Sequence, residues 1–60
     1  MLTEMQEKLL ARRGFRFRRA QRLPDGTWVA EATKDFHVAG HLGQSATDAV
    51  RNLIQLVTRR

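Results

Sequence analysis

The chain has no cysteine in its 60 residues, and this limits what it can fold into more than any other feature of the sequence. A chain of this length buries only about 60% of the surface that it exposes when unfolded, so its core is thin. Without cysteine, neither a disulfide framework nor a thiolate zinc site can stabilise such a core. Association is the usual remaining support for so small a domain. We therefore predict one small domain over residues 1–60, with no cofactor.

The composition indicates a globular domain. Hydrophobic residues make up 42% of the chain and charged residues 28%, which is too apolar for a disordered chain. No apolar run approaches the roughly 18 residues that a membrane span needs. Glu4 and Glu7 interrupt the segment in which a signal peptide would be apolar. We expect a cytoplasmic protein that does not contact membranes.

Two segments have the apolar spacing of amphipathic helices. The first, residues 3–13, opens with a capping box of Thr3 and Gln6 and ends before Gly14. The second, residues 46–58, follows Ser45 as its N-cap and has the clearest helical period in the chain. We predict that Leu53 lies at the centre of its buried stripe, which comprises Ala46, Ala49, Val50, Leu53, Ile54 and Val57.

Between the helices, three segments alternate between apolar and polar residues as strands do. A turn at residues 23–27, with proline, aspartate and glycine, separates the first two segments. A short polar break at Lys34 and Asp35 separates the second from the third. The inward-facing residues are expected to be Phe15 and Phe17, then Trp28, Ala30 and Ala32, and then Phe36, Val38, Gly40 and Leu42.

This order of elements predicts an α+β fold. We expect a small α-β-β-β-α domain, a three-stranded antiparallel sheet with two helices on one face. The unpaired edge strands predict a homodimer. The other face of the sheet is expected to be open, flat and partly basic, and to carry Arg16, Arg18, Thr27, Val29, Glu31, Thr33, His37 and His41.

The charge is concentrated in one short segment. The net charge is +5, and six arginines lie between positions 12 and 22 with no acidic residue or lysine among them: Arg12, Arg13, Arg16, Arg18, Arg19 and Arg22. A guanidinium binds phosphate or carboxylate through two parallel hydrogen bonds. The cluster predicts contact with nucleic acid or with an acidic protein surface. A solvated basic face that keeps the protein soluble remains an alternative.

The histidines do not predict catalysis. His37 and His41 are the only side chains whose ordinary pKa lies near neutrality. In a strand they would lie about 13 Å apart, at roughly 3.3 Å per residue. That separation is too large for one metal ion or one scissile phosphate, and no third ligand lies nearby in the sequence. We expect a protein that is not an enzyme and holds no metal, and leave the role of the two histidines open.

The segment from Trp28-Val29-Ala30-Glu31 through Gly40 and Gly43 to Leu53 resembles the core of HicB-type antitoxin domains. In these domains a glycine-bearing strand leads into a helix that opens with serine or threonine, an acid and alanine, and has an asparagine three residues after the alanine. Asp48, Ala49 and Asn52 match that helix. Residues 32–35 stand in place of the family's leucine-proline-glycine loop. The resemblance covers about residues 27–57 and implies an inhibitor that binds and blocks a partner protein.

The order of elements is also similar to that of double-stranded-RNA-binding domains and HicA-type toxins. RNA-binding domains carry lysines where this chain has Ala46, Thr47 and Val50. HicA-type toxins carry a ribonuclease histidine in the region that corresponds to residues 20–23, which contain none. We therefore predict a small basic, non-catalytic module that binds nucleic acid through its arginines without base specificity. A HicB-like inhibitor of a partner protein is the alternative.

Overall fold

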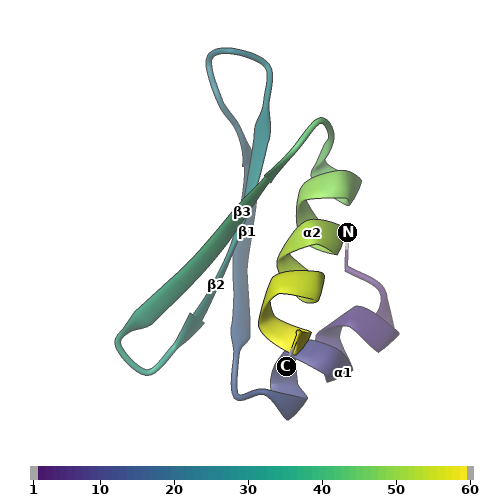
Figure 1. The fold of residues 1–60 in the computed structure, drawn as a ribbon, viewed down its shortest axis with the longest axis vertical. Helices are drawn as coiled ribbons and strands as arrows, with labels where there is room; N and C mark the ends of the chain where they lie inside the picture. The colour runs from purple at the N-terminus through teal and green to yellow at the C-terminus, as the bar shows by residue number, and fades with distance from the viewer. Residues whose placement is uncertain (1, 60) are drawn as a thin grey trace.

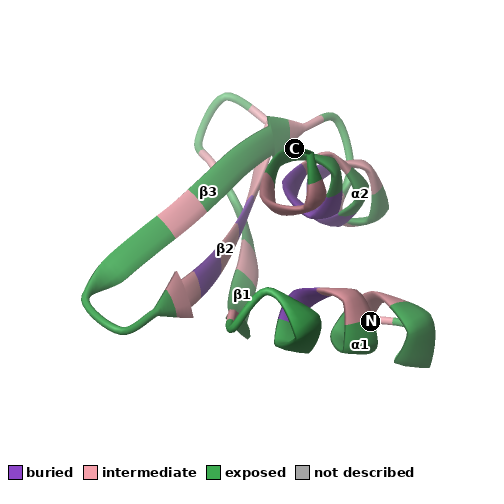
Figure 2. Ribbon diagram, turned by 60° about the horizontal axis from the view of Figure 1, so that its bottom comes forward, coloured by how far each residue is buried: buried purple, intermediate pink, exposed green. Residues whose placement is uncertain are grey.

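The computed structural model describes residues 2–59, which form a helix, three strands and a second helix (Figure 1). The strands make one antiparallel sheet in the order β1-β2-β3, so that β1 and β3 are its edges. Both helices lie on the same side of this sheet, as predicted (Figure 2). The elements are α1 (Glu4–Arg12), β1 (Arg16–Arg22), β2 (Trp28–Lys34), β3 (His37–Gly43) and α2 (Ala46–Thr58).

Local hydrogen bonds define the ends of both helices. At the start of α1, the Thr3 hydroxyl accepts from the Gln6 amide and the Gln6 side chain accepts from the Thr3 amide, both at 3.1 Å. Gly14 follows α1 with a φ of +82°, a left-handed conformation that glycine adopts at low cost. At the start of α2, the Ser45 hydroxyl accepts from the Asp48 amide at 3.1 Å. The predicted caps are confirmed.

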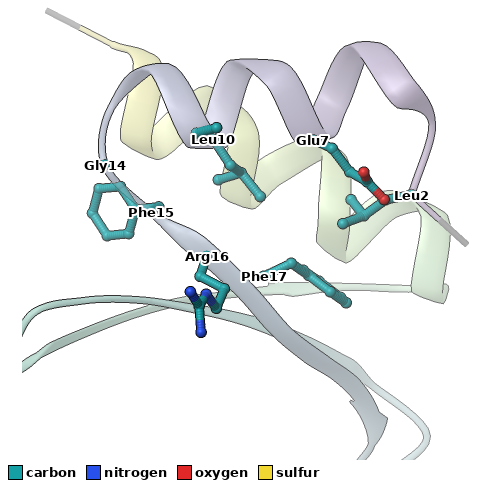
Figure 3. A pocket seen from close by; sticks show the side chains of 8 residues that line it. Leu2, Glu7, Leu10, Gly14, Phe15, Arg16 and Phe17 are labelled. Carbon is teal, nitrogen blue, oxygen red and sulfur yellow. The ribbon is translucent and has the colours of Figure 1, made fainter.

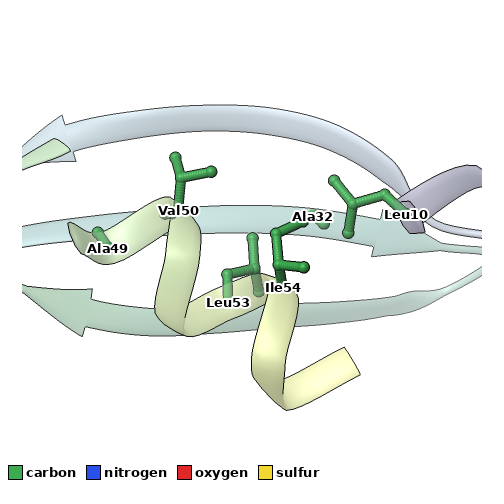
Figure 4. Close-up of a cluster of buried hydrophobic side chains, with 7 residues drawn as sticks. Leu10, Ala32, Ala49, Val50, Leu53 and Ile54 are labelled. Carbon is green, nitrogen blue, oxygen red and sulfur yellow. The ribbon is translucent and has the colours of Figure 1, made fainter. Parts of the chain in front are cut away.

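The core lies between β2 and α2 (Figure 4). Leu53 is fully buried at its centre, as the helical period predicts. Ala30 and Ala32 of β2 are also fully buried, and their small side chains let α2 approach the sheet closely. Trp28 is half-buried and packs against the margin of the core. The fully or almost fully buried residues are Leu10, Ala30, Ala32, Ala49, Val50, Leu53 and Ile54.

A bulge at Arg18 interrupts the predicted alternation of β1. Phe17 pairs with Ala32 and the next pair is Arg19 with Glu31, so Arg18 has no partner in the register. An extra residue of this kind reverses the alternation of the strand beyond it. Arg19 therefore shares the open face with Arg16, which strict alternation does not predict.

The face of β3 that was predicted to be buried is exposed. Phe36 is 101% exposed, Val38 57% and Leu42 52%. The turn before β3 comprises Asp35 and Phe36, because Lys34 already pairs with His37. The turn therefore lies one residue later than predicted, and a one-residue shift moves every side chain of a strand to the other face. Ala39, opposite the buried Ala32, is the side chain of β3 that packs against the core.

The same register corrects the expected position of the histidines. His37 lies opposite Lys34 and His41 opposite Ala30, so both belong to the side of the sheet that the helices cover, although both are exposed. Within residues 2–59 they do not join any group of three potential metal ligands. Neither helix in this range is long and apolar enough to cross a membrane.

Candidate nucleic-acid interface

The predicted arginines follow one edge of the molecule. Four of them lie on the edge strand β1, and Arg12 and Arg13 end the helix that leads into it. The seven residues of β1 extend over roughly 20 Å at about 3.3 Å per residue. All six side chains are exposed. We call this set the arginine edge: Arg12, Arg13, Arg16, Arg18, Arg19 and Arg22.

The arginine edge is a row rather than a flat patch. Arg16 and Arg19 belong to the open face of the sheet, opposite Thr33 and Glu31. Arg22 lies opposite Trp28 and belongs to the helix-covered side. The arginines of β1 therefore do not all share one face of the sheet. The bulge at Arg18 and the alternation of the strand distribute them around the edge.

Two members of the row already have partners within the protein. Arg19 Nε lies 3.1 Å from Glu31 Oε1, and the Arg19 side chain remains 54% exposed. Arg13 Nη2 donates to the Thr58 carbonyl at 3.2 Å, at the negatively polarised end of α2. Within residues 2–59, the remaining four arginines form neither an ion pair nor a side-chain hydrogen bond: Arg12, Arg16, Arg18 and Arg22. Their donors are available to an external anion.

The fold adds two cations that the sequence did not indicate. Lys34 and Arg59 lie with Arg13 around a shallow cavity of about 330 Å³ beside the start of β1, and no acidic side chain lines it. Lys34 Nζ lies 5.8 Å from the centre of the Phe15 ring. Lys34 ends β2 and Arg59 follows α2, so both are far from the arginine segment in sequence. The pairing of Arg16 with Thr33 brings Lys34 to this end of the molecule.

A second groove, of about 610 Å³, separates α1 from β1 (Figure 3). Its lining is mostly apolar and includes Leu2, Leu10, Phe15 and Phe17. Glu7 of α1 and Arg16 of β1 also line it, so the two formal charges of the lining balance and the carboxylate repels phosphate. This groove therefore does not extend the anion-binding surface of the arginine edge.

Two residues of the segment that resembles HicB-type domains, Gly43 and Asn52, lie where β3 meets α2. The Asn52 side chain donates to the Leu42 carbonyl at 2.9 Å, and Asp48 forms an ion pair with Arg51 at 2.8 Å. A Cβ atom at Gly43 would collide with the backbone of Asp48 and Ala49. Asn52 and Gly43 therefore belong to the junction between strand and helix, whereas the ion pair of Asp48 lies within α2.

Comparisons with protein-family models, curated proteins and solved structures give no match for the chain. The proposals below therefore depend on the geometry and charge of the described residues.

Proposed function

We propose that the protein binds nucleic acid through the phosphate backbone, with the arginine edge as its contact surface. The observation that carries this proposal is the set of arginines at the end of α1 and along β1 that have no partner among residues 2–59: Arg12, Arg16, Arg18 and Arg22. An unpaired guanidinium on the surface keeps all its donors for a phosphate, which it can bind in a bidentate manner. The net charge of +5 attracts a polyanion over longer distances.

The length of the edge supports contact with several phosphates. The roughly 20 Å of β1 corresponds to about six nucleotide steps of one strand, at 3.4 Å per step in a duplex. Apart from Gln21, the exposed side chains of β1 are arginines. Contacts of this kind position a protein on nucleic acid but carry no sequence information. We therefore expect similar affinity for unrelated sequences.

The salt dependence of binding tests this proposal. Each neutralised phosphate contributes about −0.9 to the slope of log affinity against log salt on duplex DNA. Replacement of Arg16 and Arg18 by Gln should weaken binding to every sequence and flatten the slope by roughly two units. Folding should change little, because exposed substitutions usually stay within about 0.5 kcal/mol. Fluorescence anisotropy with labelled duplexes over a series of salt concentrations measures the slope.

A control of the same net charge separates a local contact from general attraction. Thr47 and Arg51 are exposed on α2 and do not belong to the arginine edge, and T47E/R51Q lowers the charge as much as R16Q/R18Q does. The control should retain the slope of the parent protein. Equal losses in both double variants would mean that the arginine edge is not a specific contact.

A parent protein that binds no nucleic acid at low salt would overturn the proposal. The unpaired arginines would then be expected to bind carboxylates of a partner protein. The HicB-like inhibitor would become the better hypothesis. In that case R16Q/R18Q should reduce recovery of an acidic protein partner from the native cell, whereas T47E/R51Q should not.

A further inference from the structure

The free edge of β3 carries exposed apolar side chains and no formal charge. Phe36, Val38 and Leu42 all lie on β3 or the turn before it, and each is more than half exposed. Residues 36–44 contain no lysine, arginine, aspartate, glutamate or proline. The register between β2 and β3 is regular, without a bulge. Proteins usually protect an edge strand with charges, proline or a bulge, and β3 has none of these.

The other edge of the sheet has the opposite character. β1 carries four arginines and a bulge at Arg18. Pairing of β1 with a second β1 would place guanidinium groups against one another, and like charges on opposed strands are destabilising. The two edges therefore differ in whether a second copy of the chain can pair with them. A second copy of the chain is compatible with β3 and is repelled by β1.

On the helix side of β3, an exposed leucine continues the apolar surface. Leu56 of α2 is 46% exposed. It lines one shallow cavity together with Ala39 and another together with His41. These two strand residues flank Gly40, so Leu56 lies beside the midpoint of β3. A strand added at this edge would bring its own helix next to Leu56.

The backbone at the end of β3 indicates which groups face the free edge. The Leu42 carbonyl accepts from Asn52 of α2 at 2.9 Å, which indicates that it is directed away from β2. Residues of an antiparallel strand alternate in the direction of their backbone groups. The backbone groups of Val38 and Gly40 therefore share the direction of Leu42, toward the free edge.

We propose that two copies of the chain pair through β3 in antiparallel orientation, with the two-fold axis at Gly40, to form a six-stranded sheet. Val38 of each copy then lies opposite the partner's Leu42 on the open face. Gly40 meets its own counterpart at the axis. Leu56 of each copy approaches the axis from the helix side. A two-fold contact of this kind is self-complementary, as most dimer interfaces are.

This proposal goes beyond nucleic-acid binding and does not depend on it. The dimer would leave the arginine edge at both outer edges of the sheet. The two β1 strands would lie five strand spacings apart, or about 24 Å at 4.8 Å each. R16Q/R18Q should therefore leave the dimer intact, so that failure of one proposal is distinguishable from failure of the other.

Sedimentation equilibrium tests the dimer directly. The mass of the parent protein should rise from 6.9 kDa toward twice that value between micromolar and millimolar concentration. The variant L42K places a lysine of each copy in the interface and should remain a monomer over the same range. Met5 is 67% exposed on α1, and M5K is the matched control, which should associate as the parent does. Circular dichroism checks that each variant is folded.

Cross-linking tests the position of the axis. The chain has no cysteine of its own. A Cβ atom at Gly40 would make only ordinary contacts, the nearest at 3.5 Å from the Ala30 carbonyl oxygen, so G40C should fold. A short thiol cross-linker should join two copies of G40C efficiently and should join Q21C, on β1, only weakly. A parent protein that stays monomeric at millimolar concentration overturns the proposal, as does association of L42K or equal cross-linking at both positions.

Discussion

At the scale of single residues, Gly43 shows how closely the third strand and the second helix approach. A Cβ atom there would overlap the backbone of Asp48 and Ala49, which belong to the first turn of α2. Neither backbone segment can move aside as a flexible side chain would. We therefore expect Gly43→Ala to lower the free energy of unfolding by about 1–3 kcal/mol, the usual cost of overpacking. Urea denaturation measures this change.

Gly40→Ala is the matched comparison for that measurement. Its new Cβ atom would lie at ordinary contact distances from Ala30, Glu31 and Val29. Glycine also weakens a strand relative to residues with a side chain. The substitution should leave the protein as stable as the parent or slightly more stable. An equal loss of stability at both glycines would contradict the argument from close packing.

Asp25 makes the stability of the first hairpin depend on pH. The Thr27 hydroxyl donates to the Asp25 carboxylate at 2.7 Å and the Thr27 amide at 2.9 Å, and these bonds lower the pKa of Asp25 below its ordinary value of 3.8. The ionised form is favoured in the folded state, so this contribution to stability is present above pH 3.8. It is lost as the pH falls through the lower pKa of the folded protein.

The carboxyl carbon shift of Asp25, followed by NMR during an acid titration, measures that pKa. The midpoint should lie below 3.8 in the parent protein. Thr27→Val removes the hydroxyl donor and should raise the midpoint. An unchanged midpoint would mean that the Thr27 hydroxyl does not stabilise the ionised carboxylate.

At the scale of elements, α2 provides most of the core. Four of its residues are buried, and it contacts all three strands. Leu53 is fully buried among them, so Leu53→Ala should cost about 2–5 kcal/mol. That is a large fraction of the 5–15 kcal/mol by which domains are usually stable. Thermal denaturation should show a strongly lowered midpoint.

Gln55 provides the control on the same helix. It is exposed two residues from Leu53, and Gln55→Ala should change the stability by no more than about 0.5 kcal/mol. If the melting temperature of Leu53→Ala is close to that of the parent protein, Leu53 is not the centre of the core.

At the scale of the whole molecule, the two edges of the sheet differ in chemistry. The β1 edge is basic, and the fold adds Lys34 and Arg59 near its start. The β3 edge has no lysine, arginine or acidic residue and exposes Val38 and Leu42. Edge strands are open to pairing with other chains unless the protein prevents it. Under the two proposals the arginines would attract polyanions and repel a second β1, and β3 would be the edge at which two copies pair.

The sequence by itself determined both helices and the identity of the buried stripe. The Thr3–Gln6 capping box, Ser45 and the spacing around Leu53 act over three or four residues, and the structure confirms them. The first turn is equally local, since Asp25 bonds to Thr27 two residues away. Features that depend on such short separations are encoded by neighbouring residues, so a single sequence predicts them.

Only the tertiary structure decided which way the strand side chains face. The bulge at Arg18 adds one residue to β1, and the turn at Phe36 lies one residue later than predicted. Each of these shifts exchanges the side chains that face the helices with those on the open face. The alternation in β3 does not decide which face is buried. His37, Ala39 and His41 are not strongly polar as a set, and the residues between them are not strongly apolar. The register depends on pairing with β2 and on the close approach of α2 at Gly43. This pairing joins residues that are far apart in the sequence, so neighbouring residues do not encode it. It places the arginines of β1 on both sides of the sheet and leaves Val38 and Leu42 exposed.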